Sequence, residues 1–213
     1  MVCAALSGAS ALPALAAPPR GTLTSHEYTV LSSGEAKYTA ALKRINWDAA
    51  FAACRAVGSS TDLLKGERDS CLTETRLLKG LANFPRHESN CGTAEPHKDL
   101  CLVPLYVGLT NNAKAMYQAD MVERRVAAQR GFTGRCLDVL GNTSRQLEQQ
   151  RALANATEKL TNDVRTGAEI VEGKLPSNAI NVSKVDSDAK AFERDANLVL
   201  AQTGPKLSAC PHQ

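Results

Sequence analysis

Apolar residues recur every three or four positions over most of residues 25–203, which is the spacing of helices that bury one face. The same region is rich in Ala, Leu, Lys, Glu, Arg and Gln, and these residues lose little conformational freedom in a helix. No segment shows the alternation of apolar and polar residues that is typical of a β-strand. The pattern therefore predicts an all-α protein, and since no repeat of fixed length is visible, an up-and-down bundle of four to six helices is favoured over a solenoid.

Turn and capping residues set the expected ends of these helices. Thr61 offers an N-cap oxygen to the third helix, Pro85 stops it, and Pro104 suits the first turn of the fourth. Residues 85–99, with two prolines, a glycine and two histidines, are predicted to form an ordered surface loop. The predicted helices cover residues 25–46, 47–57, 62–84, 104–130, 133–166 and 185–201.

The N-terminal residues 1–16 are apolar and uncharged and end in Ala-Leu-Ala, the small-x-small pattern that precedes signal peptidase cleavage. A membrane-spanning helix needs about 20 apolar residues, so this segment is too short to span a bilayer. Because no Lys or Arg precedes the apolar run, an Ala-rich N-terminus of a cytosolic protein is the alternative. The expected divisions are a signal peptide over 1–16, a flexible linker over 17–24, a bundle domain over 25–204 and a tail over 205–213 tethered by Cys210.

Six cysteines follow the predicted signal peptide, and an even number behind an export signal indicates disulfides in an oxidising compartment. The protein is therefore expected to be secreted or periplasmic. The nearest two cysteines lie in the predicted loop, a second two lie on helices joined by a short turn, and the remaining two would fasten the C-terminal tail. The expected pairs are Cys91 with Cys101, Cys54 with Cys71, and Cys136 with Cys210, while other connectivities remain open.

The charge balance gives no indication of nucleic-acid binding. The chain has 25 basic and 22 acidic residues and a formal net charge of +3. Its most basic stretch, from Arg124 to Arg135, also holds no aromatic residue apart from Phe132, and Glu123 and Asp138 flank it. This composition is typical of a solvated helix face rather than of a surface that stacks on bases.

The predicted loop carries the residues that the sequence singles out for binding, namely His87, Glu88 and His97. A polar loop pinned to a rigid scaffold by a disulfide is a common place for recognition residues. The two histidines together with Cys91 and Cys101 are also zinc-ligand types, so a metal site is an alternative if both thiols are free. The expected state is a disulfide with no metal and no cofactor.

No sequence motif assigns a catalytic residue. The chain lacks Gly-x-Ser-x-Gly, Cys-x-x-Cys and a phosphate-binding Gly-x4-Gly-Lys motif. Aromatic residues make up only 4%, which disfavours stacking platforms for sugars. We therefore expect an exported, non-enzymatic helical protein that binds another protein or the cell envelope, of undetermined oligomeric state. The alternatives are a metal or haem carrier using the histidine-containing loop, and a secreted enzyme with a site among Glu27, His87, Glu88 and His97.

Overall fold

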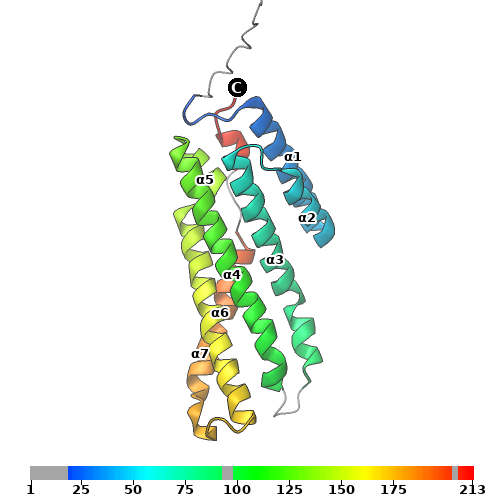
Figure 1. Cartoon of the computed structure of the whole chain (residues 1–213), viewed down its shortest axis with the longest axis vertical. Helices are drawn as coiled ribbons and strands as arrows, with labels where there is room; N and C mark the ends of the chain where they lie inside the picture. Colours follow the sequence, from blue (N-terminus) through cyan, green and yellow to red (C-terminus); the bar gives the residue numbers. More distant parts are fainter. Residues whose placement is uncertain (1–18, 93–97, 203–205) are drawn as a thin grey trace, which may run out of the picture.

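The computed structural model of the chain describes residues 19–92, 98–202 and 206–213. The predicted signal peptide and His97 lie outside these residues. Four long helices, α3 (Asp62–Asn90), α4 (Lys98–Gln129), α6 (Ser144–Val171) and α7 (Val182–Leu200), run up and down beside one another (Figure 1). α4 packs between α3 and α6, and α7 packs on α6. The prediction of an all-α, disulfide-bridged bundle is confirmed.

Three further helices complete one end of the bundle. α1 (Ser25–Lys43) and α2 (Trp47–Ala56) form a hairpin in which α2 packs on α3 (Figure 1). α5 (Gly134–Gly141) packs on the end of α4 and on the C-terminal segment, which contains the short 3-10 helix η2 (Leu207–Ala209). A further 3-10 turn, η1 (Ser177–Ala179), links α6 to α7. The C-terminus therefore lies beside the beginning of α1, as Figure 1 shows.

The helix N-termini are fixed by side chains that accept hydrogen bonds from otherwise unpaired backbone N–H groups. Thr24 and Glu27 form a capping box at α1, and Thr143 and Gln146 form one at α6. Thr61 caps α3 through a hydrogen bond from the N–H of Leu64, as the sequence predicts.

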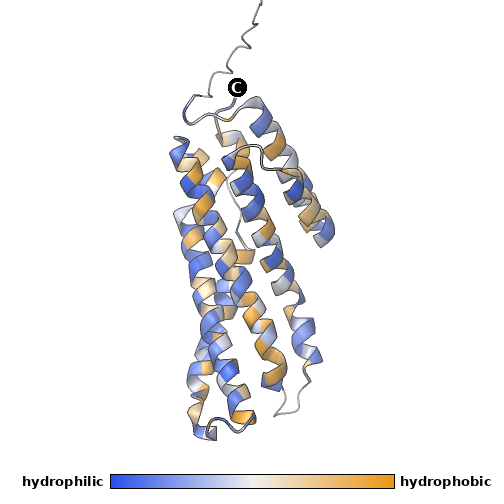
Figure 2. Ribbon diagram, viewed as in Figure 1, coloured by the Kyte–Doolittle hydropathy of each residue, from blue (hydrophilic) through white to orange (hydrophobic). Residues whose placement is uncertain are grey.

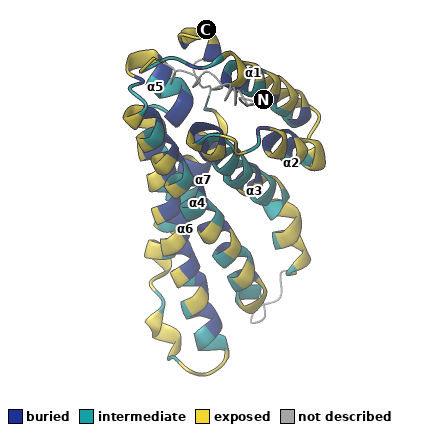
Figure 3. Ribbon diagram, turned by 45° about the horizontal axis from the view of Figure 1, so that its top comes forward, coloured by how far each residue is buried: buried dark blue, intermediate teal, exposed yellow. Residues whose placement is uncertain are grey.

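The apolar faces of the helices meet in a core that runs along the bundle (Figures 2 and 3). At the end near the C-terminus, Leu23, Leu63 and Phe132 are almost completely buried. At the opposite end, the ring of Phe84 packs against Tyr106, with ring centres 4.9 Å apart.

Three disulfides join neighbouring elements. Their Cα atoms lie 5.5 Å, 5.6 Å and 4.7 Å apart, within the usual range for a bridge. The pairs are those expected from the sequence: Cys54 with Cys71 joins α2 to α3, Cys91 with Cys101 joins α3 to α4, and Cys136 with Cys210 joins α5 to the tail.

The predicted loop over residues 85–99 is wrong in extent. α3 continues through Pro85 to Asn90, and α4 already begins at Lys98. Proline removes only one hydrogen bond of the helix, and two neighbouring features hold this turn in place. Phe84 packs into the core, and Cys91, the residue after α3, is bridged to α4.

The predicted fifth helix is likewise broken in two, between α5 and α6. Asn142 has a φ of 61° and ends α5, and Thr143 then caps a new helix. α7 begins at Val182, three residues before its predicted start, because Asn181 caps it.

Residues 19–24, part of the predicted flexible linker, include the fully buried Leu23. The backbone N–H of Leu23 donates to the carbonyl of Pro211, so this segment is held against the C-terminal tail. None of the helices that the structure describes is long and apolar enough to cross a membrane.

Candidate functional site: a buried acidic cavity

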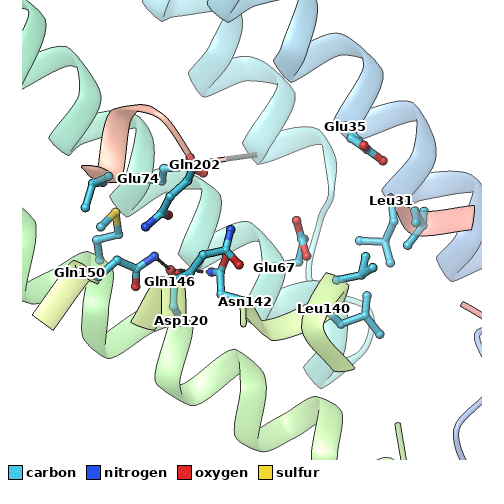
Figure 4. Close-up of a pocket in the computed structure, with 14 residues that line it drawn as sticks. Leu31, Glu35, Glu67, Glu74, Asp120, Leu140, Asn142, Gln146, Gln150 and Gln202 are labelled. Carbon is cyan, nitrogen blue, oxygen red and sulfur yellow. Dashed lines mark hydrogen bonds between the residues drawn. The ribbon is translucent and has the colours of Figure 1, made fainter. Parts of the chain in front are cut away.

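A cavity of about 230 Å³ opens between α1, α3, α4 and the segment around the α5–α6 junction (Figure 4). Apolar side chains of Leu31, Met116 and Leu140 form part of its wall. Its polar lining consists of carboxylates and amides: Glu35, Glu67, Glu74, Asp120, Asn142, Gln146, Gln150 and Gln202. A second cavity of about 140 Å³ shares several of these residues and adds Tyr38, Ser70 and Glu123.

The acidic residues form a ladder along two antiparallel helices. Glu67 and Glu74 are seven residues apart on α3, so they lie on nearly the same face at levels separated by about 10 Å. Asp120 on α4 accepts a hydrogen bond from the Ser70 hydroxyl, which places it between those two levels. Glu123 packs beside Gly66, which places it near the level of Glu67.

Asp120 is 2% exposed and accepts hydrogen bonds from three neutral side chains. Besides Ser70, these are the amides of Asn142 and Gln150, each with a nitrogen 2.7 Å from Oδ2 (Figure 4). The φ of 61° at Asn142, a value that favours glycine, turns this residue toward the cavity. The preceding Gly141 allows close packing, since a Cβ at that position would collide with the backbone of Arg124.

Two buried oxygen atoms beside the cavities have no hydrogen-bond donor among residues 19–92, 98–202 and 206–213. They are Oε1 of Gln150 and Oε1 of Glu123, on side chains that are each 3% exposed. A buried acceptor without a donor carries a substantial free-energy cost, of the order of 1–3 kcal/mol. The amide oxygen of Gln150 can only accept, so it would be satisfied by a ligand that donates hydrogen bonds. The carboxyl groups of Glu123 and Glu67 instead share a hydrogen bond when one of them is protonated.

The carboxyl groups of the ladder favour their neutral forms. Burial, followed by the negative charges of Asp120 and Glu67, raises the pKa of Glu74 to about 7. Burial raises the pKa of Asp120 to about 6, although its hydrogen bonds from Ser70 and Gln150 act in the opposite direction. Burial also raises the pKa of Glu67. The pKa of Glu123 is raised well above its ordinary value, first by burial and then by the negative charge of Glu67. These shifts arise because burial penalises the charged form of each carboxyl group.

The described residues that line the two cavities include no Lys, Arg or His. Exposure also decreases inward: Glu35 lies at the surface, Glu67 and Glu74 are half-buried, and Asp120 and Glu123 are buried. The arrangement therefore offers a graded series of negative groups leading from solvent into the bundle, which favours entry of a cation.

A divalent metal ion fits this arrangement poorly. Within the described part of the chain, no three His, Cys, Asp or Glu side chains converge closely enough to hold one. The carboxylates are instead spaced along the helix axes.

The residues that the sequence singled out lie elsewhere. His87 and Glu88 are on the last turns of α3, with His87 exposed, and His97 lies outside the described residues. Cys91 and Cys101 form a disulfide, so the alternative zinc site with two thiolates is not formed.

Glu27 lies far from His87. It accepts a hydrogen bond from Thr61 at the start of α3, and His87 is 26 residues further along that helix, about 39 Å away. The structure therefore does not bring the four residues of the hypothetical enzyme site together.

The acidic cavity was missed by the sequence analysis, although a signal was present. Asp120 and Glu123 fall at the positions where the apolar stripe of α4, from Leu109 through Met116 to Ala127, continues. On α3, Ser70 similarly lies seven residues from both Leu63 and Leu77, on the same face of the helix. Polar residues at core positions of a bundle are a recognised sign of a buried polar site.

Comparison with known proteins finds no relative of this chain. No family model, no curated protein and no solved structure matches the chain.

Proposed function

We propose that this chain is an exported, non-enzymatic binding protein that takes a small, positively charged ligand into the acidic cavity of its bundle. The observation that carries the proposal is the set of five acidic side chains, from Glu35 at the mouth to Asp120 and Glu123 inside, with no basic side chain in the described lining. Export is supported by the three disulfides, which persist in oxidising compartments.

A cation would supply the positive charge that the described lining lacks, together with hydrogen-bond donors. Its charge would stabilise the buried carboxylates, whose burial raises the pKa values of Glu74 and Asp120. Its N–H donors would reach the amide oxygen of Gln150, which has no donor among the described residues. The ligand would therefore bind most tightly where the carboxyl groups are ionised. Since the pKa of Glu74 is about 7, affinity should rise between pH 5 and pH 8.

The test is a binding measurement with matched probes of opposite charge. Isothermal titration calorimetry of the oxidised protein at pH 8 would compare 1,4-diaminobutane, butylamine and calcium chloride with sodium succinate. We expect at least one of the cations to bind and succinate not to bind, with weaker cation binding at pH 5. Absence of binding by every cation, or equal binding by succinate, would reject the proposal.

A matched pair of variants separates the cavity from general surface charge. Glu67→Gln removes one cavity charge, whereas Glu158→Gln removes an exposed charge on α6 that pairs with Lys114 at 2.7 Å. The cavity variant should weaken cation binding at least ten-fold, and the surface variant should leave it unchanged.

A second candidate function is recognition of another protein or of the cell envelope by the end of α3. It is favoured by the exposure of His87 beside the bridge between Cys91 and Cys101, which holds this end on α4. Changing His87, Glu88 and His97 together to Ala should then abolish capture of the partner in a pull-down while the melting temperature stays unchanged.

A further inference from the structure

The shape and spacing of the acidic ladder restrict the class of cation, an inference that rests on the proposed function. The negative groups do not surround one point: Glu67 and Glu123 lie near one level, Asp120 lies about one helical turn further, and Glu74 lies about 10 Å from Glu67 along the axis of α3. One compact ion can contact one of these levels but not all of them. A ligand with several positive charges at intervals can contact them together.

Part of the wall of the cavity is apolar. Leu31 from α1, Met116 from α4 and Leu140 from α5 are each at most 5% exposed and line the same cavity as Glu67 and Glu74. Methylene groups are favourable against such side chains, whereas the water shell of a hydrated metal ion is not. The lining therefore offers contacts for hydrocarbon as well as for positive charge.

We propose that the ligand is a linear aliphatic diamine or polyamine, whose ammonium groups pair with the carboxylates at successive levels and whose methylenes lie on the apolar wall. One ammonium group binds at Asp120 and donates to Oε1 of Gln150, which lacks a donor among the described residues. Another binds at the level of Glu67 and Glu123, whose neighbouring carboxyl groups otherwise share a proton. Each ammonium group has three N–H donors, enough to contact a carboxylate and an unpaired acceptor at once.

The carboxylate at the far end, Glu74, distinguishes this ligand class from a simple cation. A monoamine can occupy the deepest level without contacting Glu74, whereas a longer polyamine reaches it. The neutral variant Glu74→Gln keeps the shape of the side chain and its hydrogen-bonding capacity toward Tyr38. Loss of this charge should therefore affect long ligands more than short ones.

The experiment is calorimetric titration of the full oxidised protein at pH 8 with spermidine, 1,4-diaminobutane, butylamine and magnesium chloride, at 50 mM and 300 mM sodium chloride. Spermidine should bind at least ten-fold more tightly than butylamine at both salt concentrations. In Glu74→Gln the affinity for spermidine should fall at least ten-fold and the affinity for butylamine less than three-fold. Glu158→Gln, which removes an exposed acid, should change neither.

The outcomes separate this inference from the proposed function. Equal affinities for spermidine and butylamine, tighter binding of magnesium, or an unchanged spermidine affinity in Glu74→Gln would overturn the polyamine assignment and leave a cation-binding cavity. Loss of the advantage of spermidine at 300 mM salt would mean unspecific attraction to surface charge and would also overturn it. If none of the four cations binds, both proposals fail.

Discussion

Two buried acidic sites lie in the same helical bundle, and they differ in their partners. Glu27, at the end of the bundle near the C-terminus, is 1% exposed and accepts two hydrogen bonds from the guanidinium of Arg130, at 2.7 Å and 3.2 Å. Thr24 and Thr61 donate to the same carboxylate. Asp120, in the cavity, is buried equally but accepts only from neutral groups. The two carboxylates are therefore equally buried, but Glu27 has a cationic partner whereas Asp120 has only neutral partners among the described residues.

The pKa values of the acids in the two sites are consequently shifted in opposite directions. Burial would raise the pKa of Glu27, but the hydrogen bonds and charge of Arg130, together with those from Thr24 and Thr61, lower it below the ordinary value. In the cavity, burial dominates, and the pKa of Glu74 rises to about 7. Glu27 in its ionised form therefore stabilises the fold, whereas the ionised cavity acids destabilise it.

The largest expected effect comes from opening the end of the bundle that holds Glu27. The disulfide between Cys136 and Cys210 spans 74 residues and fixes the tail, in which His212 stacks on Tyr28 with ring centres 3.7 Å apart. Replacing both cysteines by Ala should lower the free energy of unfolding by about 4 kcal/mol, since a long loop is released in the unfolded chain. Urea denaturation measures the loss.

The matched control is the pair Cys91 and Cys101, which closes a separation of only 10 residues. Its double Ala variant should lose less, about 3 kcal/mol. If the two variants lose the same amount, the tail does not close this end of the bundle.

The second prediction removes the ion pair itself. Glu27→Gln keeps a side chain that can bond the N-cap backbone of Thr24, but it leaves Arg130 without its carboxylate. Because a partly buried charge then lacks a partner, we expect a loss of about 3 kcal/mol at pH 7. The exposed ion pair of Glu158 with Lys114 provides the comparison, and Glu158→Gln should cost less than about 0.5 kcal/mol. Similar losses for both variants would show that burial of Glu27 adds nothing to its pairing.

The third prediction concerns the dependence of stability on pH. The folded state holds protons on the cavity acids more tightly than the unfolded chain does, so stability should fall as pH rises from about 4.5 to about 7. One pKa unit corresponds to about 1.4 kcal/mol, and with allowance for the partial exposure of Glu74 we expect it to contribute about 2 kcal/mol. Glu74→Gln should therefore be more stable than the unmodified protein at pH 8 and equal to it at pH 4.5.

Urea denaturation at five pH values in the absence of amines checks this expectation. A stability that does not fall between pH 5 and pH 8 would contradict it. Acids paired as Glu27 is change the stability only at lower pH, where a carboxylate with a lowered pKa takes up its proton.

The difference between the two sites also explains how far the sequence could be interpreted. Helix-forming composition, the 3.6-residue period and capping residues such as Thr61 are local signals, and they predict the bundle and most helix ends. The extension of α3 through Pro85 depends on the packing of Phe84 and on the bridge to α4, which are tertiary features. The binding residues expected from the sequence lie at His87, Glu88 and His97, and the acids of the cavity are not among them.

Asp120 and Glu123 could have been noticed as acids within an apolar stripe, but their partners could not. Gln150 is 30 residues away in the sequence, and Asn142 reaches Asp120 only because its backbone takes a left-handed turn. A single sequence contains no local signal for that turn, since Asn is compatible with an ordinary helix as well.

The smallest expected effect on stability tests this turn. With φ at 61° and ψ at 156°, Asn142 occupies a backbone region that is almost restricted to glycine, at a cost of about 1–3 kcal/mol. Asn142→Gly relieves that cost but removes the amide that donates to Asp120, a hydrogen bond worth about 1.5–3 kcal/mol when the acceptor is charged. The net change in the free energy of unfolding should be less than about 1 kcal/mol, while the pKa of Asp120 rises further because one stabilising hydrogen bond is lost. Carbon-13 NMR titration of the aspartate carboxyl groups follows that pKa directly. A normal stability together with an unchanged pKa of Asp120 would mean that Asn142 shapes the chain without tuning the acid. A raised pKa of Asp120 would show that the hydrogen bond from Asn142 stabilises the ionised form of this acid.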